Sequence, residues 1–380
     1  MRNPRPGYQI GAEFPKWSWV RARVLQLPGG ASRIRSEMKA IDLTEVTVVI
    51  PSYNSSATIE AAVRSALLQT EPVSVIVVDD ASKDDTVQKV QALAEDTHRL
   101  SVLVQSRNQG PSAARNRAIL AADTSWIAIL DGDDHMHPDR IRRMLEVALA
   151  EDLDIVADDL IRISAEPDPK TATRLWSDTP IGLIHVDLAR FARENIDKYT
   201  GSRRELGYLK PLMRRSFLID QKISYNETMR LAEDYDLYMR ALRSGARFGL
   251  IDPCGYYSID YPNSLSKEYA SADLRKVLDR DVELLRQPGL TSVERRAVRE
   301  HKTLAYKHWA WIRLIEMVRD RNLLGAARSL IAPPAVFGAL LLRLCRHALG
   351  KEPVPHAVES TAEIQSIDAI LKNTTASLTS

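Results

Sequence analysis

The chain has 380 residues, of which 44% are hydrophobic and 27% are charged. This composition excludes wholesale disorder, and the length suits one large domain or a domain with an extension. A net charge of only +2 gives no general signal for polyanion binding, so we expect no nucleic-acid partner. Two cysteines, Cys254 and Cys345, are too few for a disulfide framework or a zinc cluster and indicate a reducing cytoplasm.

The first 45 residues form a basic extension. Residues 1–40 carry eight Lys or Arg against Glu13 and Glu37, which favours an acidic partner such as an anionic membrane surface. A solvated tail is the alternative interpretation. The segment has no apolar signal-peptide core, and the longest apolar stretch, residues 330–342, is shorter than the roughly 20 residues that cross a bilayer. We therefore expect a cytoplasmic protein, soluble or peripheral on the cytosolic face of the inner membrane.

From Val46 onward, apolar runs alternate with amphipathic helical patterns. Short continuous apolar runs are typical of strands buried on both faces. They predict strands over residues 46–51, 73–80, 100–106 and 126–130. The helix behind Pro138 is expected to bury Ile141, Leu145, Ala148 and Leu149. This alternation predicts a doubly wound, mainly parallel α/β sheet.

Beyond residue 150 the alternation weakens. The patterns predict one further strand over 153–163, a helix over 236–245, a strand and turn over 248–259, and helices from about 269 to 348. In the helical part, Trp309, Trp311 and residues 340–344 supply the apolar component.

Polar residues follow each of the first four predicted strands. They are Asn54 after the first strand, Asp79 and Asp80 at the end of the second, Asn108 after the third, and Asp131, Asp133 and Asp134 after the fourth. Ligands of open α/β sheets bind beyond the carboxyl ends of the strands. We therefore expect these polar groups to converge on one crevice.

The sequence "DGDD" at 131–134 combines carboxylates with a glycine. Asp131 and Asp133 are two residues apart on an extended chain and face the same way, and Gly132 allows a tight turn between them. This arrangement suits a hard cation that also binds substrate phosphates. A solvated turn is one alternative. A phosphatase-type aspartate nucleophile is another, but His135 stands where that motif has Thr or Val, and we expect this histidine to be a bystander.

Six stretches occur in a characteristic order. They are "VTVVIPSYNSSATIEAAVRSALLQT", "VIVVDDASKDDT", "NQGPSAARNRAI", "WIAILDGDDHMHPDRI", "LKPLMRRSFL" and "RLAEDYDLYMRAL". Together they resemble the family 2 glycosyltransferases, whose fold is of the GT-A type. The resemblance covers about residues 46–245. No G-x-G-x-x-G follows the first strand, and no P-loop motif occurs, so other nucleotide-binding folds are not supported.

The resemblance implies roles for the strand-end residues. Pro51 and Tyr53 are similar to residues that flank the nucleobase, where an aromatic ring can stack. Asp80 resembles the carboxylate that accepts the imide N–H of uracil, and Arg115 resembles an arginine that contacts the nucleotide.

The same resemblance makes Asp131 and Asp133 the metal-binding pair, with Asp133 as the direct ligand of Mg²⁺ or Mn²⁺. The cation would neutralise charge on the departing diphosphate. Asn54, Asn108 and Gly132 are expected to face the nucleotide sugar as well.

Asp234 of "AEDYD" resembles the family's catalytic base. Inverting transfer needs one carboxylate that takes the proton of the acceptor hydroxyl. The alternative for Glu233 and Asp234 is an acidic helix N-terminus without a catalytic role.

The sequence departs from the family behind this base. Many members carry an Arg or His there that helps to bind the diphosphate. Residues 256–267 instead offer Tyr257, Asp260 and Ser264, with Lys267 as the nearby cation. Which group closes over the diphosphate is left open.

We therefore expect an inverting, metal-dependent glycosyltransferase that uses a UDP-linked nucleotide sugar such as UDP-glucose. Its expected acceptor is a glycan or lipid-linked oligosaccharide in exopolysaccharide or cell-surface polysaccharide synthesis. The alternatives are a sugar nucleotidyltransferase and a non-catalytic nucleotide-sugar-binding scaffold. A nucleotidyltransferase would need a loop rich in glycine and in lysine or arginine after the first strand, and "PSYNSS" is not such a loop.

The predicted organisation has four units. They are the basic extension 1–45, a GT-A catalytic domain over 46–265 with a nucleotide-sugar half to residue 150 and an acceptor half from 151, a helical extension over 266–350, and a tail over 351–380. The helical extension is expected either to contact an anionic membrane or to form a homodimer.

Overall fold

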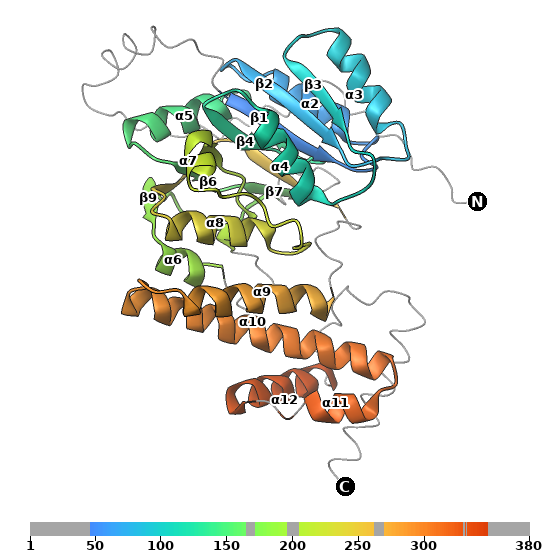
Figure 1. Cartoon of the computed structure of the whole chain (residues 1–380), viewed down its shortest axis with the longest axis vertical. Coiled ribbons are helices and arrows are strands. Elements are labelled where there is room, and N and C mark those ends of the chain that lie inside the picture. Colours follow the sequence, from blue (N-terminus) through green and yellow to red (C-terminus); the bar gives the residue numbers. More distant parts are fainter. Residues whose placement is uncertain are drawn as a thin grey trace.

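The computed structural model describes residues 46–164, 172–195, 205–261, 270–329, 331 and 333–348. The predicted extension 1–45 and tail 351–380 lie outside these residues. An α/β sheet region forms one end of the molecule, and a stack of helices forms the other (Figure 1).

The first half of the main sheet is parallel throughout. Strands β1 (Val46–Ser52), β2 (Val73–Asp79), β3 (Leu100–Val104) and β4 (Trp126–Ile129) lie in the order β3-β2-β1-β4. Helices α2 (Ile59–Leu67), α3 (Thr86–Glu95), α4 (Pro111–Ala121) and α5 (Arg140–Ala150) alternate with them. Valine and isoleucine fill β1 and β2 because both faces of these strands are buried. Leu149 of α5, which we predicted to face inward, is 37% exposed.

The second half of the main sheet is mixed. Strands β10 (Leu212–Arg214), β6 (Ile155–Asp158), β11 (Phe248–Ile251) and β9 (Leu183–Val186) continue the sheet beyond β4 in that order. β10 runs antiparallel to both β4 and β6, and β9 runs antiparallel to β11. The predicted fold class, a mainly parallel mixed sheet with a helical region behind it, is thereby confirmed.

The single strand predicted over 153–163 was wrong. The chain leaves the main sheet after β6 and enters a second sheet as β7 (Ile161–Ser164), which lies between β12 (Tyr256–Asp260) and β8 (Thr173–Arg174). The other edge of β12 pairs with β5 (His135–Met136). Two buried carboxylates stand at the break. Asp158 accepts hydrogen bonds from the Arg140 guanidinium at 2.7 and 3.0 Å, and Asp159 accepts the backbone N–H groups of Trp176 and Ser177.

Four short helical elements link the two halves to the extension. They are α6 (Leu188–Arg193), the 3₁₀ turn η2 (Leu206–Tyr208), α7 (Arg215–Asp220) and α8 (Glu233–Arg243). Helix α8 begins three residues before the predicted start at 236. Ala232, which precedes it, has a left-handed backbone with φ of 59°. That conformation costs an alanine roughly 1–2 kcal/mol, so the surrounding contacts must hold it in place.

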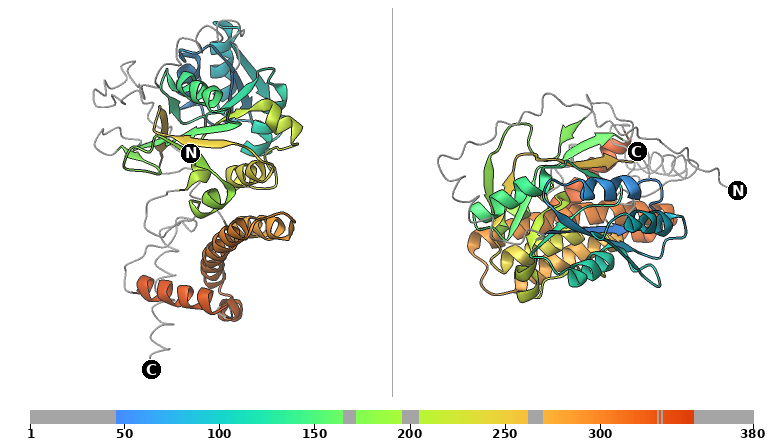
Figure 2. Two further views of the ribbon diagram at one scale, coloured as in Figure 1. Left: turned by 90° about the vertical axis from the view of Figure 1, so that its left-hand side faces the viewer. Right: turned by 90° about the horizontal axis from the view of Figure 1, so that it is seen from above.

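The helical extension consists of α9 (Ser271–Arg286), α10 (Ser292–Arg319), α11 (Leu323–Ser329) and α12 (Pro334–Ala348), stacked away from the sheets (Figure 2). It has an apolar cluster of its own, in which Trp311 and Leu340 are 2% and 1% exposed. Trp311 and Leu340 therefore belong to the core of the extension. Among the helices of the described ranges, none has the length and hydropathy that crossing a bilayer requires.

Candidate active site

The ends of β1, β2 and β4 meet as predicted. Gly132 lies so close to β1 that a side-chain Cβ there would sit 3.2 Å from the carbonyl oxygen of Pro51. The Thr58 hydroxyl donates to the Gly132 carbonyl at 2.8 Å. A larger residue here would have to displace the Pro51 carbonyl by a few tenths of an ångström, because the loop after β4 packs directly against the end of β1.

The predicted nucleotide contacts at β1 and β2 are held by internal hydrogen bonds. Asp80 accepts from the Gln105 side chain at 2.6 Å and from the backbone N–H groups of Gln109 and Gly110 at 2.7 Å each. Asn54 accepts from the Lys83 N–H through its side chain, while its own N–H donates to Ser82. These bonds join three strand-end loops into one preformed edge.

Some groups at this edge are free to meet a ligand. The Tyr53 side chain is 39% exposed, and Asn108 is exposed too. Ser52 Oγ and Asp79 Oδ1 are buried and have no hydrogen-bond partner within the described chain. They stand opposite each other in the register of β1 and β2. Asp79 was among the strand-end residues predicted from the sequence, whereas Ser52 was not, because only burial without a partner distinguishes it.

A cluster of charged side chains connects the loop after β4 to the start of α8. We call it the site cluster; it consists of Asp131, Asp133, Glu233, Asp234, Arg115 and Lys210. The two cations bridge the two segments. Arg115 binds Asp131 and Glu233, each at 2.8 Å, and Lys210 Nζ lies 3.1 Å from Asp131 Oδ2 and 2.9 Å from Asp234 Oδ2.

These bridges set the protonation of the groups that they join. Burial alone would raise the pKa of Asp131, but Lys210 and Arg115 outweigh burial and hold that pKa well below its usual range. Burial would likewise lower the pKa of Lys210, yet Asp131 and Asp234 raise it above its usual range. Both groups are therefore fully charged at neutral pH.

Asp133 differs from Asp131 in its ion pairs and in its pKa. It has no ion pair with a Lys or Arg in the part of the chain that the structure describes. Burial, followed by the neighbouring Asp131 charge, raises the pKa of Asp133 to about 6. The four carboxylates of the site cluster outnumber its two cations, so about two negative charges remain uncompensated when all are ionised.

This charge pattern fits a divalent cation. No group of three or more His, Cys, Asp or Glu side chains in the described ranges is placed to hold a metal by itself. Asp133, with Asp131 beside it, would therefore supply one or two carboxylates and leave the remaining positions to phosphate and water oxygens. Mg²⁺ commonly binds in this way.

Asp234 has an oxygen to spare. Its side chain is buried, its Oδ2 is bonded to Lys210, and its Oδ1 has no hydrogen-bond partner among the described residues. Arg115 Nη1 lies 4.0 Å from Oδ1. Glu233 uses its carboxylate on Arg115 instead. Of the two acidic residues that begin α8, Asp234 is the one with a buried oxygen that lacks a hydrogen-bond partner among the described residues.

The residues that follow Asp133 in the loop after β4 have structural partners. Asp134 accepts from the Tyr256 hydroxyl at 2.7 Å and from the Ile259 N–H at 2.9 Å, which attaches β12 to the loop. Burial raises its pKa well above the usual range. His135 belongs to strand β5 and is half-buried.

Two further candidate site residues, Lys210 and Tyr225, were not predicted from the sequence. Lys210 stands alone before a proline, and nothing in its local pattern indicates that two carboxylates meet it. The Tyr225 ring lies beneath the Arg115 guanidinium at 5.2 Å, a contact that also arises only in the folded chain. Of the groups proposed to replace the usual Arg or His, Ser264 and Lys267 lie outside the described residues. Tyr257 pairs with β7 in the second sheet.

Comparison with known proteins defines the class. Residues 47–217 match the family described as Glycosyl transferase family 2. The chain belongs to this family, as the motif resemblance indicated. The chain is 34% identical over 336 residues to the succinoglycan biosynthesis protein ExoU of Rhizobium meliloti (strain 1021), covering 86% of this chain and 96% of that protein. It is also 34% identical to ExoO of the same organism, over 78% and 84% of the two chains.

Solved structures share the fold. S. aureus TarS 1-349 in complex with UDP-GlcNAc superposes with a TM-score of 0.60 at 19% identity, over 88% of this chain and 92% of that chain. The mannosyltransferase PcManGT from Pyrobaculum calidifontis, in complex with GDP-Man and Mn²⁺, gives a TM-score of 0.50 at 16% identity, over 91% and 92%. At these identities the likeness extends to the fold alone.

Proposed function

We propose that this glycosyltransferase transfers a sugar with inversion from a UDP-linked donor, such as UDP-glucose, to a glycan hydroxyl during exopolysaccharide synthesis. Two relatives are named as succinoglycan biosynthesis proteins, and a structural neighbour holds UDP-GlcNAc, which supports the pathway class and the nucleotide. The observation that carries the proposal is the buried Asp234 carboxylate, which has one oxygen on Lys210 and the other without a hydrogen-bond partner among the residues that the structure describes.

The chemistry follows from that unpartnered oxygen. Asp234 Oδ1 takes the proton of the acceptor hydroxyl while the hydroxyl oxygen attacks the anomeric carbon. The bond from that carbon to the diphosphate breaks on the opposite face, and UDP leaves with the electron pair. Lys210 holds Oδ2, which fixes the orientation of the carboxylate. Asp133 and Asp131 would hold Mg²⁺ or Mn²⁺, and the cation would stabilise the departing diphosphate.

The strand-end residues would bind the nucleotide. The exposed Tyr53 ring is available to stack on uracil, with Pro51, Asn54, Asn108 and Gly132 around it. A carboxylate has about four acceptor sites, and the three internal bonds of Asp80 leave one for the imide N–H. Arg115 would contact the nucleotide from the side of the site cluster.

The acceptor would be lipid-linked and presented at an anionic membrane. Leu324, Ile331 and Leu342, at the far end of the extension, are 77%, 85% and 60% exposed. Residues 321–350 contain four arginines and no Asp or Glu. Like charges disfavour pairing of two such surfaces, which makes an anionic bilayer a better partner than a second copy of the chain. Each basic residue near such a surface contributes about 1 kcal/mol to binding.

Vesicle sedimentation tests this contact. Leu342→Glu is expected to reduce binding to phosphatidylglycerol-containing vesicles. Val293→Glu is the control and is expected to leave binding unchanged, because Val293 is similarly exposed but lies at the start of α10, away from α11 and α12. Equal binding to vesicles of phosphatidylcholine alone, or a concentration-dependent dimer that Leu342→Glu dissolves, would contradict the membrane assignment.

The function itself is tested with Asp234→Asn, which keeps the shape of the side chain and removes its basicity. Transfer from a panel of labelled nucleotide sugars to glycan acceptors should fall by at least about 10²-fold, while thermal stabilisation by UDP with Mn²⁺ should persist. Asp187→Asn is the matched control, because Asn also caps α6 at this position. Turnover at the wild-type rate would exclude Asp234 as the base. No metal-dependent stabilisation by UDP, GDP or dTDP would count against a nucleotide-sugar enzyme and for the scaffold alternative.

A further inference from the structure

Helix α8 faces two regions at once. Its first two residues, Glu233 and Asp234, belong to the site cluster, while the next two, Tyr235 and Asp236, are bonded to the helical extension. All four lie within one helical turn. The base and the extension are therefore connected through a single turn of backbone, which starts at the strained Ala232.

Tyr235 makes the deeper of the two connections. Its hydroxyl donates to Asp281 Oδ1 of α9 at 2.8 Å, and His301 Nδ1 of α10 lies 2.7 Å from Asp281 Oδ2 and 3.0 Å from the same hydroxyl. The ring is stacked between Phe191, at 5.9 Å, and His301, at 4.4 Å. All of these polar groups are buried, and burial followed by Asp281 raises the pKa of Tyr235, so the hydroxyl remains a donor.

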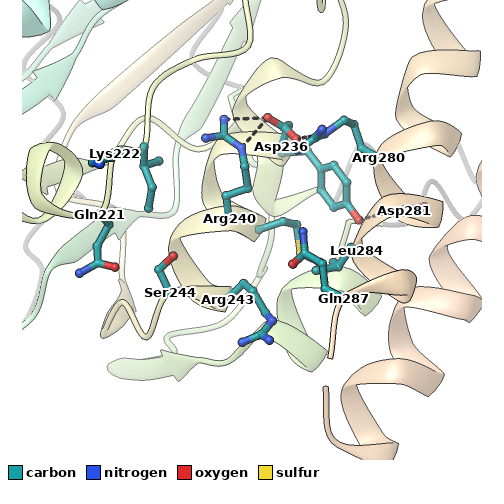
Figure 3. A pocket seen from close by; sticks show the side chains of 13 residues that line it. Gln221, Lys222, Asp236, Arg240, Arg243, Ser244, Arg280, Asp281, Leu284 and Gln287 are labelled. Atoms are coloured by element: carbon teal, nitrogen blue, oxygen red, sulfur yellow. Dashed lines mark hydrogen bonds and ion pairs between the residues drawn. The ribbon is translucent and has the colours of Figure 1, made fainter. Parts of the chain in front are cut away.

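Asp236 makes the second connection. Arg280 of α9 donates to its Oδ1 at 2.6 Å, and Arg240 of α8 donates to its Oδ2 at 2.9 Å. Figure 3 shows the two guanidinium groups converging on Asp236 from the two helices, beside a pocket at the junction. Asp236 is 3% exposed, so this carboxylate is compensated almost entirely by the two arginines.

We infer that Tyr235, Asp236, Arg280 and Asp281 are positioning residues, through which the helical extension holds Asp234 in its reactive orientation. This inference rests on the proposed role of Asp234. A buried network could instead contribute stability alone. The two roles differ in kinetics, because a loosened helix start displaces the base without touching the nucleotide edge at β1 and β2.

The test uses the whole chain with two substitutions. Tyr235→Phe removes only the hydroxyl, and Arg280→Met keeps the aliphatic stem of a partly exposed side chain. We expect each to lower kcat about 10-fold, less than the roughly 10²-fold cost of a full misplacement of about 1 Å. The dissociation constant for UDP with Mn²⁺ should change less than about twofold. Turnover is followed as UDP release from whichever sugar nucleotide of the panel wild type uses fastest.

Ser271→Ala is the matched control. It removes a bond between α9 and α10, from Ser271 to Glu316, that touches no residue of α8. Its kcat should equal that of wild type. Hydrogen exchange over residues 232–238 gives a second measurement that needs no sugar donor, and it should speed up in Tyr235→Phe and Arg280→Met but not in Ser271→Ala.

The outcomes separate the two proposals. Unchanged kcat and unchanged exchange in Arg280→Met would overturn the positioning inference, and this variant decides if Tyr235→Phe does not fold. An equal loss of kcat in Ser271→Ala would also overturn it, because a general loss of stability would then explain the effect. If Asp234→Asn keeps wild-type turnover, the proposed function fails instead, whatever the positioning variants do.

Discussion

The catalytic region and the helical extension both bury charged side chains, but they pair them differently. In the extension, both oxygens of Asp281 have partners, and Glu316 accepts from both the N–H and the hydroxyl of Ser271. In the catalytic region, one oxygen of Asp234 has no partner, and Asp133 has no ion pair within the described chain. Complete pairing is typical of structural groups, whereas incomplete pairing marks the groups that await a ligand.

The largest effect on stability is expected when a cation is removed from the site cluster. Lys210→Met leaves Asp131 and Asp234 without the ammonium group between them. We expect a loss of about 3–5 kcal/mol in the free energy of unfolding, measured by urea denaturation. Lys222→Met, at an exposed lysine, should change stability by less than about 0.5 kcal/mol. Equal stability of Lys210→Met and wild type would mean that the bridge is not formed in solution.

The next largest effect is expected for Asp133, the proposed metal ligand. Asp133→Asn should leave the stability of the ligand-free chain equal to wild type or higher, because it removes a carboxylate that burial disfavours. Calorimetry should show affinity for UDP with Mn²⁺ reduced by about 10- to 100-fold, since each 1.4 kcal/mol lost is tenfold. Asp123→Asn, at an exposed site, is the control. Undiminished affinity in Asp133→Asn would remove this residue from the metal site.

A fully paired carboxylate of the extension should behave as a structural group. Glu316→Gln weakens the bonds to Ser271, and we expect a loss of about 1–2 kcal/mol in the free energy of unfolding. At a temperature where the variant is folded, kcat should match wild type. A large loss of activity without loss of stability would erase the distinction between the two regions.

The smallest effect concerns pH. Burial raises the pKa of Asp159 from 3.8 to about 6, so the folded chain binds this proton more tightly than the unfolded chain does. Its contribution therefore stabilises the fold at low pH and is lost as pH rises through about 6. Between pH 5 and 7.5, wild type should lose about 1 kcal/mol of stability relative to Asp159→Asn. If the free energies of unfolding of the two proteins changed in parallel with pH, the raised pKa of Asp159 would be contradicted.

Much of the nucleotide half was predictable, because parallel strands buried on both faces appear as continuous apolar runs. β1, β2 and β4 were each found to within a residue. The second half was harder. A single apolar run over 153–163 does not reveal that Asp158 and Asp159 will be anchored by Arg140 and by the backbone after β8.

The grouping of the candidate site residues was predictable where a motif is local. Asp131, Asp133 and Asp234 stand in short recognisable stretches, and the structure brings them to one place. Lys210 was missed because a lysine that bridges two distant carboxylates leaves no periodic signal. The connection from Tyr235 to Asp281 joins segments 46 residues apart and depends on helix packing that local sequence does not encode.

If Asp234 is the base and the acceptor hydroxyl attacks opposite the diphosphate, the configuration at the anomeric carbon is inverted. Proton NMR of the first product formed from UDP-glucose, or from whichever α-linked UDP-sugar is used, tests this inversion directly. We predict a β-linked product from wild type and none from Asp234→Asn. An α-linked product would mean retention of configuration, which attack opposite the diphosphate cannot give, and would contradict the proposed mechanism.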